Sequence, residues 1–502
     1  MTIKKKLGIF IAVATLVRML VAMTTNLGND EAYYLTYAQH LQWNYFDHPP
    51  MVALLIRLTT FDLTFTNSFF VRLGPIILAA INTYIIFKIV TKLKNETAGF
   101  WAIILFTASI YTSLIAGVFI MPDAPQLFFW ILCVYFLLEI IDDNANSKSR
   151  NRNLVWFAIC SGLCIMSKIH GVFLWFGFGL YVLFYNRKML SNGYLYLSVI
   201  LTAAIVSPIL FWNINNDFIT YSFHSQRVTI NEGLNFSAFL RELVGGILYN
   251  NLFNYALIIF TLLAVFKNKI SIALHQKRLL LLLGLPLIVI LLFISLFRDT
   301  LPHWSGPGYL ALIILAAIYA AENLKKAKLA LNGLYLIGFV VVAGIPLINF
   351  YPGTLGDKKL ETFGAGDFTL DLYGWNQMKT DFEKMRQSDL QSNNTKTSFI
   401  ISNKWFPGGH IDNYIAQPLH LDFVAIGKLE DIHTYYWLNN FRKKIQKGDD
   451  AYFIVTSNNF SDPNVDYVNL FEIIEKPRII NQYRSGKVCR KMIVFLMRNF
   501  KG

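Results

Sequence analysis

The chain has 502 residues, of which 55% are hydrophobic, 15% are aromatic and only 15% are charged. A soluble globular protein usually carries about 25% charged residues, so this chain has too little polar surface to cover itself in water. The same composition excludes a disordered chain, a collagen-like chain and a nucleic-acid-binding tail. The net charge of +14 makes the placement of the basic residues informative. We therefore expect a polytopic membrane protein.

The apolar windows predict the number of membrane spans. A helix needs about 20 mostly apolar residues to cross the hydrocarbon core, and the sequence has windows for about 11 such helices. A turn is expected at residues 166–170. The first window does not resemble a cleavable signal peptide, because its apolar stretch is long and no small-x-small site follows it. The windows begin near Leu7, Phe69, Thr97, Ala124, Leu154, Gly171, Tyr194, Gly246, Leu279, Tyr309 and Gly333.

Lysine and arginine alternate between the two sides of these spans. If the N-terminus is cytoplasmic, roughly 18 basic residues lie in cytoplasmic connections and about 5 in the opposite short loops. This asymmetry accounts for the positive charge without a nucleic-acid partner. An odd number of spans places the end of the chain outside the cytoplasm. The basic connections hold Lys88, Lys92 and Lys94; Lys148, Arg150 and Arg152; Arg187 and Lys188; Lys267, Lys269, Lys277 and Arg278; and Lys325, Lys326 and Lys328.

Two domains follow from this order. Residues 1–351 are predicted to form the transmembrane domain, with outer loops at 26–68, 116–124, 213–245 and 298–308. Residues 352–502 are more polar and alternate strand-like with helix-like segments, which predicts an extracytoplasmic α/β domain. The expected strands are 398–402, 451–456 and 492–497, and the expected helices are 375–390 and 434–446. The four cysteines, three of them in apolar runs, cannot form a disulfide framework.

The first outer loop opens with two adjacent carboxylates, Asp30 and Glu31. In a structural interpretation, Asn29 or Asp30 caps a helix that runs to about Leu41. In a functional interpretation, one carboxylate acts as a general base at the membrane surface. A capping residue can also be catalytic, so the two interpretations are compatible.

Further ionisable residues fall on the same predicted side. Asp47 and His48 precede Pro49 and Pro50, a pattern typical of a helix start, and would lie at the rim of the first loop. Asp123 is an isolated carboxylate between two prolines at the end of a span, where a charged group is costly and tends to be functional. Lys168 and His170 lie at an outer turn, where the lysine either binds a phosphate or extends to the interface. Arg72, Arg298 and His303 complete the set.

These residues and their order resemble the GT-C superfamily of polyprenyl-phosphate-dependent glycosyltransferases. The likeness is to the bacterial branch related to protein O-mannosyltransferases and to the aminoarabinose transferases of lipid A. It covers about the first 310 residues, and Asp371-Leu372-Tyr373-Gly374-Trp375 adds to it. The residues that carry it are Asp30-Glu31-Ala32-Tyr33-Tyr34, Tyr45-Phe46-Asp47-His48-Pro49-Pro50, Val71-Arg72-Leu73, Pro122-Asp123-Ala124-Pro125, Ser167-Lys168 and Pro302-His303-Trp304.

The resemblance implies an enzyme that takes a sugar from a lipid phosphate on the outer leaflet of the bacterial inner membrane. It assigns Asp30, beside Glu31, and Asp123 to catalysis, and it brings Lys168 to the lipid phosphate. The chain has Asp47-His48-Pro49 where lipid A transferases have Glu-Lys-Pro, so it lacks that lysine. In the mechanism that this implies, Asp30 deprotonates the acceptor hydroxyl, while Lys168 with Arg298 or His303 stabilises the leaving phosphate. One carboxylate with in-line attack implies inversion.

Several alternatives stay open at this stage. A transporter or flippase of polyprenyl-linked glycolipids would place ionisable groups near the bilayer midplane. A polymerase or ligase would share the donor and differ in the acceptor, and a scaffold would need Asp30 and Asp123 only as caps. The acceptor is a lipid such as lipid A, a polysaccharide or a protein. The sequence requires no cofactor, although Asp30, Glu31, Asp47 and Asp123 could group around a divalent metal.

Overall fold

The structure is a computed structural model that describes residues 2–229 and 233–502. The chain forms two compact units. The first unit comprises Met1–Leu20, Gln42–Phe65 and Phe69–Val341, and the second comprises Val21–Leu41, Thr66–Ser68 and Val342–Gly502. A short early segment of the chain, residues 21–41, therefore folds together with the C-terminal part.

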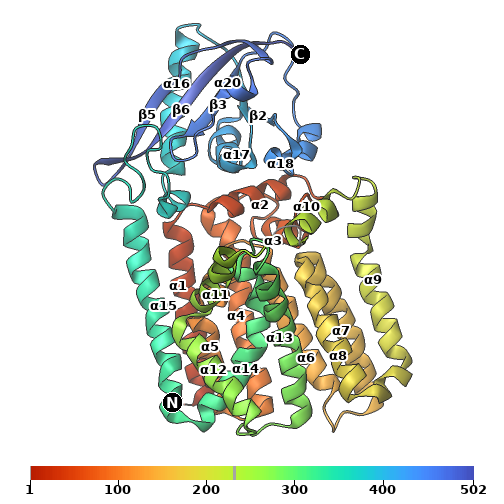
Figure 1. The fold of residues 1–502 in the computed structure, drawn as a ribbon. Coiled ribbons are helices and arrows are strands. Elements are labelled where there is room, and N and C mark those ends of the chain that lie inside the picture. Colours follow the sequence, from red (N-terminus) through yellow and green to blue (C-terminus); the bar gives the residue numbers. More distant parts are fainter. Residues whose placement is uncertain (1, 230–232) are drawn as a thin grey trace. The chain divides into compact units, whose positions relative to one another are not determined.

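The first unit is a bundle in which the long helices lie lengthwise beside one another (Figure 1). Short elements, among them α3, η1, η2, η4 and α10, connect the long helices. The helices of this unit are α1 (Ile3–Thr24), α3 (Met51–Thr59), α4 (Ser68–Leu93), α5 (Glu96–Ala108), η1 (Tyr111–Ile115), α6 (Asp123–Ile140), α7 (Ser147–Ser167), η2 (Ile169–Gly171), α8 (Val172–Tyr185), η3 (Arg187–Ser191), α9 (Gly193–Ile214), α10 (Ile219–Val228), α11 (Phe236–Asn250), α12 (Leu252–Phe266), α13 (Leu274–Ser295), η4 (Pro302–Ser305), α14 (Gly306–Glu322) and α15 (Leu324–Phe350).

Among the described residues, seven helices are long and apolar enough to cross a membrane, and α11 with α12, bent by 99°, could form an eighth span. This confirms a multi-pass membrane protein. Each of the eleven predicted windows falls on a helix, but the count of 11 spans is not confirmed. Three windows lie on α5, α7 and α8: α5 and α8 are short, and the first turns of α7 carry Lys148, Arg150 and Arg152.

Charged side chains join the connections at one end of this bundle. The Lys92 ammonium lies 3.1 Å from a carboxylate oxygen of Asp142 and also pairs with Glu139. Lys94 lies 2.7 Å from Glu322 and donates to the carbonyl oxygen of Ser271. The basic connections that follow α4 thus meet those around α6, α12 and α14 at the same end of the bundle.

The second unit contains a six-stranded mixed sheet with the order β2-β1-β3-β6-β4, and β5 also pairs with β6. Strands β2, β1 and β3 are parallel, whereas β6 runs antiparallel to its neighbours β3, β4 and β5. The strands are β1 (Phe399–Ser402), β2 (Asp422–Ala425), β3 (Ala451–Thr456), β4 (Phe471–Ile474), β5 (Arg478–Arg484) and β6 (Lys487–Phe500). All three predicted strands are therefore confirmed.

Successive residues of the strands point to opposite faces of this sheet. Ile400 joins a core beneath α16 and α17, while its neighbours Phe399 and Ile401 join a core on the other face. The helical elements of the unit are α2 (Asn29–Gln39), η5 (Phe368–Leu372), α16 (Trp375–Gln391), α17 (Trp405–Ile411), η6 (Asp412–Ala416), η7 (Gln417–Leu419), α18 (Leu429–Ile432), α19 (Tyr435–Leu438), η8 (Asn439–Phe441) and α20 (Pro463–Asp466). The predicted helix 375–390 is confirmed by α16.

The predicted helix at residues 434–446 is wrong beyond its first turns. Helix α19 ends at Leu438, and one short 3-10 turn follows it. The Arg442 guanidinium donates to the carbonyl oxygen of Phe423 (3.1 Å) and lies 2.6 Å from the Asp412 carboxylate. These long-range contacts hold the backbone of Arg442 in an extended conformation, with φ −111° and ψ 161°, so helix propensity does not decide the local structure.

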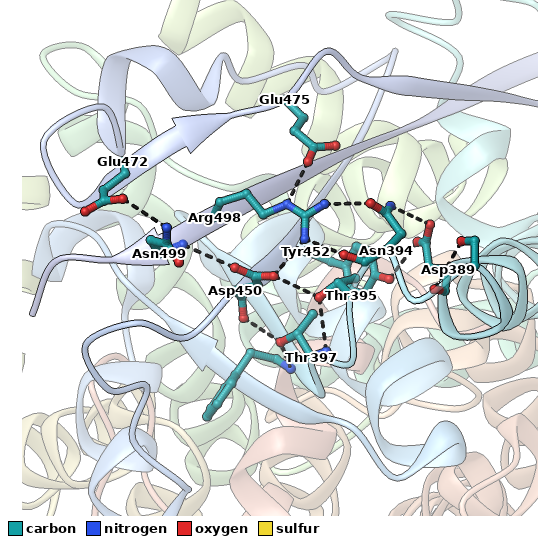
Figure 2. A network of polar contacts seen from close by, with 12 residues as sticks. Asp389, Asn394, Thr395, Thr397, Asp450, Tyr452, Glu472, Glu475, Arg498 and Asn499 are labelled. Atoms are coloured by element: carbon teal, nitrogen blue, oxygen red, sulfur yellow. Dashed lines mark hydrogen bonds and ion pairs between the residues drawn. The ribbon is translucent and has the colours of Figure 1, made fainter.

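A network of polar side chains lies at the amino ends of the parallel strands of the sheet (Figure 2). The Arg498 guanidinium lies 3.0 Å from Asp450 and 2.7 Å from Glu475, and it also donates to the carbonyl oxygen of Asn394. Asp389 accepts a hydrogen bond from the Tyr452 hydroxyl (2.7 Å). The network joins the end of α16 to β3, β4 and β6, and it pairs the charges at this edge of the sheet.

A second ion pair, between Asp367 and Arg484, is fully buried. Arg484 also donates to the carbonyl oxygens of Ile348 and Gly353, so it ties the chain that leaves α15 to β5. Burial acts to raise the pKa of Asp367, but hydrogen bonds from Thr369, Leu355 and Thr354 outweigh it and hold the pKa below its usual value.

We expect Asp367→Asn to destabilise the protein by about 3–5 kcal/mol, because Arg484 would be left as an unpaired buried charge. A carboxyl group whose pKa is lowered by folding stabilises the protein above its unfolded pKa, and this contribution disappears as the pH falls through the folded pKa. The difference in melting temperature between the wild type and Asp367→Asn should therefore shrink as the pH is lowered from 7 towards 3. A constant difference would contradict an electrostatic role of Asp367.

Candidate functional site

The first unit contains a buried ion pair between Asp123 and Lys168. The Lys168 ammonium lies 2.8 Å and 3.0 Å from the two carboxylate oxygens of Asp123. Asp123 is completely buried and Lys168 is 2% exposed. Removing both charges from water is costly, so a pair of this kind at a helix end marks a candidate functional site.

The ends of two helices bring the pair together. Asp123 is the first residue of α6, which follows Pro122, and a carboxylate is favoured at the positive N-terminal end of a helix. Lys168 follows the last residue of α7, where the backbone turns extended, with φ −158° and ψ 135°. The prediction that Lys168 lies at a turn is confirmed, and the binding of a phosphate by its ammonium stays a prediction.

Tyr111 completes this centre, and sequence reasoning missed it. Its hydroxyl donates to the Asp123 carboxylate at 3.1 Å, and its ring is completely buried. Tyr111 begins the π-helical turn η1, a type of irregularity that is frequent at functional sites. In the sequence this tyrosine lies between Ile110 and Thr112, where it looks like an ordinary aromatic residue of a membrane helix, so no local signal distinguishes it.

Gly306, at the start of α14, packs against the ring of Tyr111. A Cβ atom at Gly306 would lie 2.5 Å from three ring carbons, so any side chain there forces Tyr111 to move. We expect Gly306→Ala to lower activity about tenfold or more, because a displacement near 1 Å is costly in a positioned site. Tyr111→Phe, which keeps the ring and removes the hydroxyl, separates the two effects. Equal activity of wild type and Gly306→Ala would contradict this role of Gly306.

Three predicted histidines lie within electrostatic reach of the ion pair. His48, His170 and His303 each interact with both Asp123 and Lys168. Burial lowers the pKa of His48 to about 3, so this imidazole is neutral at pH 7. The ring of His224, which the sequence did not single out, lies 6.3 Å from that of His48. The structure therefore assembles ring nitrogens around one charged pair.

The remaining predicted residues of the first unit hold neighbouring segments. The backbone carbonyl of Asp47 lies 2.8 Å from His224 Nε2, so this contact involves the backbone and not the carboxylate. The guanidinium of Arg72, which is completely buried, lies over the ring of Phe119 at 5.3 Å. The Arg298 Nε donates to the carbonyl oxygen of Thr229 at 2.7 Å.

Asp30 and Glu31 belong to the second unit, in the first turn of α2. Asp30 is exposed, whereas Glu31 is 2% exposed and accepts a hydrogen bond from the backbone N–H of Gly28 at 2.8 Å. The N-cap is Gly28, so the prediction that Asn29 or Asp30 caps the helix is wrong. Glu31 instead satisfies the backbone at this end, as the third residue of a capping box does. Of these two adjacent residues, Asp30 is the exposed one.

The second unit anchors α2 along its length. The Tyr414 hydroxyl accepts from the N–H of Leu27 (2.7 Å), and the Asn413 side chain donates to the carbonyl oxygen of Ala32 (2.8 Å). A Cβ atom at Gly409 would lie 3.2 Å from the backbone of Tyr33, so this glycine permits the close approach of α17 to α2. Helix α2 is therefore a structural part of the C-terminal unit.

A third carboxylate, Asp371, lies near the start of α2. It hydrogen-bonds the Asn29 side chain, and burial raises its pKa. The neighbouring backbone is also fixed, because the N–H of Trp375 donates to the Asn26 side chain at 3.1 Å. The motif that begins at Asp371 thus contacts the acidic segment directly. Within either unit, the described residues include no group of three His, Cys, Asp or Glu side chains that could hold a metal ion.

Comparisons with known proteins show which families this chain is similar to. Residues 47–212 match the family model for dolichyl-phosphate-mannose-protein mannosyltransferase. The chain is 25% identical over 345 residues to lipid A galacturonosyltransferase RgtD of Rhizobium johnstonii, which covers 65% of this chain and 67% of that protein.

The fold is similar to that of ArnT from Cupriavidus metallidurans. Its apo structure matches with a TM-score of 0.60 at 14% identity, over 98% of both chains. Its structure with undecaprenyl phosphate matches with a TM-score of 0.61 at 15% identity, over 97% of both chains. In fold over nearly its whole length, and in sequence over residues 47–212, this chain resembles the GT-C glycosyltransferases related to protein O-mannosyltransferases and lipid A transferases.

Proposed function

We propose that the protein is a membrane glycosyltransferase that moves a sugar from a polyprenyl-phosphate donor to an acceptor on the outer face of the bacterial inner membrane. The observation that carries this proposal is the buried Asp123–Lys168 pair, held at a helix end among His48, His170 and His303. The structural relative that binds undecaprenyl phosphate supports a lipid phosphate as the donor's carrier.

The residues divide the chemistry between them. A sugar phosphodiester already contains its leaving group, so the enzyme has to deprotonate the acceptor hydroxyl and stabilise the departing phosphate. Asp30 accepts the hydroxyl proton, and the hydroxyl oxygen attacks the anomeric carbon as the bond to the phosphate oxygen breaks. Lys168, oriented by Asp123, stabilises the negative charge that develops on the leaving phosphate. In-line attack with one carboxylate inverts the anomeric centre.

For the acceptor we propose a lipid, with lipid A as the first candidate. The support is a relative that is a lipid A galacturonosyltransferase and a fold that is shared with ArnT. The 352–502 segment lies outside the cytoplasm in this proposal, because α15 starts among the basic residues Lys325, Lys326 and Lys328 and ends at Phe350, just before this segment. No step of the reaction is assigned to a metal or cofactor.

The test is a gene deletion in the host, followed by mass spectrometry of envelope glycolipids, glycans and glycoproteins. The deletion strain is complemented with wild type or with Asp30→Asn at matched expression. We expect one glycosylated species to disappear, its lipid-linked donor to accumulate, and only the wild type to restore the pattern. The missing mass then identifies both the sugar and the acceptor.

Two results would contradict the proposal. If Asp30→Asn restores the pattern, Asp30 is not the base. If the donor accumulates only on the cytoplasmic side and every outer transfer still occurs when it is supplied from outside, the protein is a flippase of polyprenyl-linked glycolipids. A flippase would carry ionisable groups near the bilayer midplane, whereas Asp123 and Lys168 lie at helix ends.

A further inference from the structure

The second unit contains a cleft of about 310 Å³ that the proposed reaction does not use. Residues that follow three different strands line it: Asn403 and Lys404 follow β1, Lys428 and Asp431 follow β2, and Ser461 follows β3. The cleft therefore lies at the carboxyl ends of the three parallel strands, on the opposite edge from the network of Figure 2.

The order of the strands in the sheet indicates that this position is suited to ligand binding. The chain leaves β1 towards β2 on one side and leaves β3 towards β4 on the other, because the strand order is β2-β1-β3-β6-β4. The carboxyl ends of β1 and β3 thus form a switch point, where open α/β sheets bind their ligands. Two independent features, the cleft and the strand order, coincide here.

Polar contacts inside the cleft hold its walls. The Asn403 side chain is 5% exposed and donates to the Ser461 hydroxyl (2.7 Å) and to the Asp466 carboxylate (2.6 Å). A Cβ atom at Gly427 would lie 2.7 Å from the carbonyl oxygen of Asn403, so the loops after β1 and β2 are in close backbone contact. The three loops are therefore fixed to one another before any ligand binds.

The charges that face the cleft differ from those at the other edge of the sheet. Arg498 is paired with Asp450 and Glu475 there. In the part of the chain that the structure describes, Lys404 and Lys428 form no ion pair with a carboxylate, although Asp431, Asp462 and Asp466 line the same cleft. Cations and carboxylates that share a cleft without neutralising each other leave both kinds of group available to a ligand.

We propose that this cleft binds a saccharide that carries an anionic group, such as a sugar phosphate. Lys404 and Lys428 attract the anion, as lysines do for phosphates. Ser461 and the carboxylates of Asp431 and Asp462 accept hydrogen bonds from the sugar hydroxyls. The inference rests on the proposed function in one respect: it makes the cleft a subsite for the headgroup of a phosphorylated glycolipid acceptor.

Titration calorimetry of the full-length protein in nanodiscs tests the proposal, with glucose 6-phosphate, glucose and inorganic phosphate as probes. We expect glucose 6-phosphate to bind more tightly than either glucose or phosphate. The Lys404→Gln/Lys428→Gln variant should bind it at least tenfold more weakly. The matched control is Lys396→Gln/Lys476→Gln, which changes two exposed lysines of the same unit that do not line the cleft.

A second variant tests the sugar itself. Asp431→Asn should weaken the binding of glucose 6-phosphate and leave that of inorganic phosphate unchanged. Equal binding of phosphate and glucose 6-phosphate, or an equal loss in the control variant, would overturn the proposal. Because binding is measured without turnover, a negative result here leaves the transfer assay intact, and loss of the transferase function leaves this binding result intact.

Discussion

Asp123→Asn is expected to lower the rate of sugar transfer at least about a hundredfold, the cost of losing a positioned charge in a water-excluded site. Lys168→Met should do the same. The substitutions remove opposite members of one pair, so each single variant leaves a buried charge unpaired and also loses about 3–5 kcal/mol of stability. Activity alone therefore cannot tell a catalytic pair from a structural one.

The double variant Asp123→Asn/Lys168→Met separates these roles. It removes both charges, so its melting temperature should recover most of what the single variants lose. We expect it to remain inactive, because the leaving phosphate then meets no cation. The measurement is transfer from a polyprenyl-phosphate sugar by purified protein, with melting temperature in parallel. A stable double variant that retains wild-type activity would show that the pair only supports the fold.

Asp30→Asn is expected to slow turnover by about 10²–10⁴-fold, the usual contribution of a general base. The melting temperature should stay near that of the wild type, because Asp30 is exposed in the first turn of α2. The adjacent Glu31→Gln is the matched control. It loses a charged acceptor for the Gly28 N–H, which costs about 1 kcal/mol of stability, and should keep most of the activity.

The pH profile of the same variants gives an independent readout. The base must be deprotonated, so the rate of the wild type should fall at acid pH, and the residual activity of Asp30→Asn should lack that fall. If Glu31→Gln is the inactive variant while Asp30→Asn is active, the base is Glu31, and the assignment based on exposure is wrong.

Apolar length and charge placement predicted much of the membrane unit. All eleven windows lie on helices, because about 20 apolar residues have few other ways to satisfy their backbone in a bilayer. The count of 11 spans is not confirmed where a helix is short, as in α5, or bent, as between α11 and α12. Hydropathy measures composition and does not detect where a helix breaks.

The C-terminal unit shows the other limit. Strands β1, β3 and β6 were evident as apolar runs, but β2, β4 and β5 were not predicted. In β5 the usual alternation is reversed, because Gln482 and Arg484 are buried while Ile479 and Tyr483 are exposed. The hairpin between β5 and β6 had a local signal, Ser485-Gly486, where both residues have positive φ, 47° and 77°. Such a two-residue turn favours a hairpin. Residues 442–446 were predicted to be helical from their local sequence. The backbone of Arg442 is instead extended, because its side chain contacts Phe423 and Asp412, which are distant in the sequence.

For the candidate site, the residue types and their shared side of the membrane identified candidate residues. The contacts between these residues could not be predicted from the sequence. Asp123 and Lys168 are separated by 45 residues, and nothing in their own segments predicts that they pair. Tyr111 and Gly306 escaped notice because an aromatic and a glycine beside apolar runs are common in any membrane helix bundle. Their link to the site appears only in the structure, where Gly306 packs against the Tyr111 ring and the Tyr111 hydroxyl donates to Asp123.

The anchoring of α2 has a consequence for how the protein is made. Leu27 cannot form its hydrogen bond until Tyr414 has been synthesised, 387 residues later. At about 5–20 residues per second, the synthesis of these residues takes roughly 20 to 80 s. During that interval the apolar helices can already enter the bilayer, while the segment with Asp30 has none of its C-terminal partners. A ribosome that stalls early therefore leaves an inserted chain whose acidic helix is unanchored, so the nascent chain acquires a complete Asp30 segment only near the end of translation.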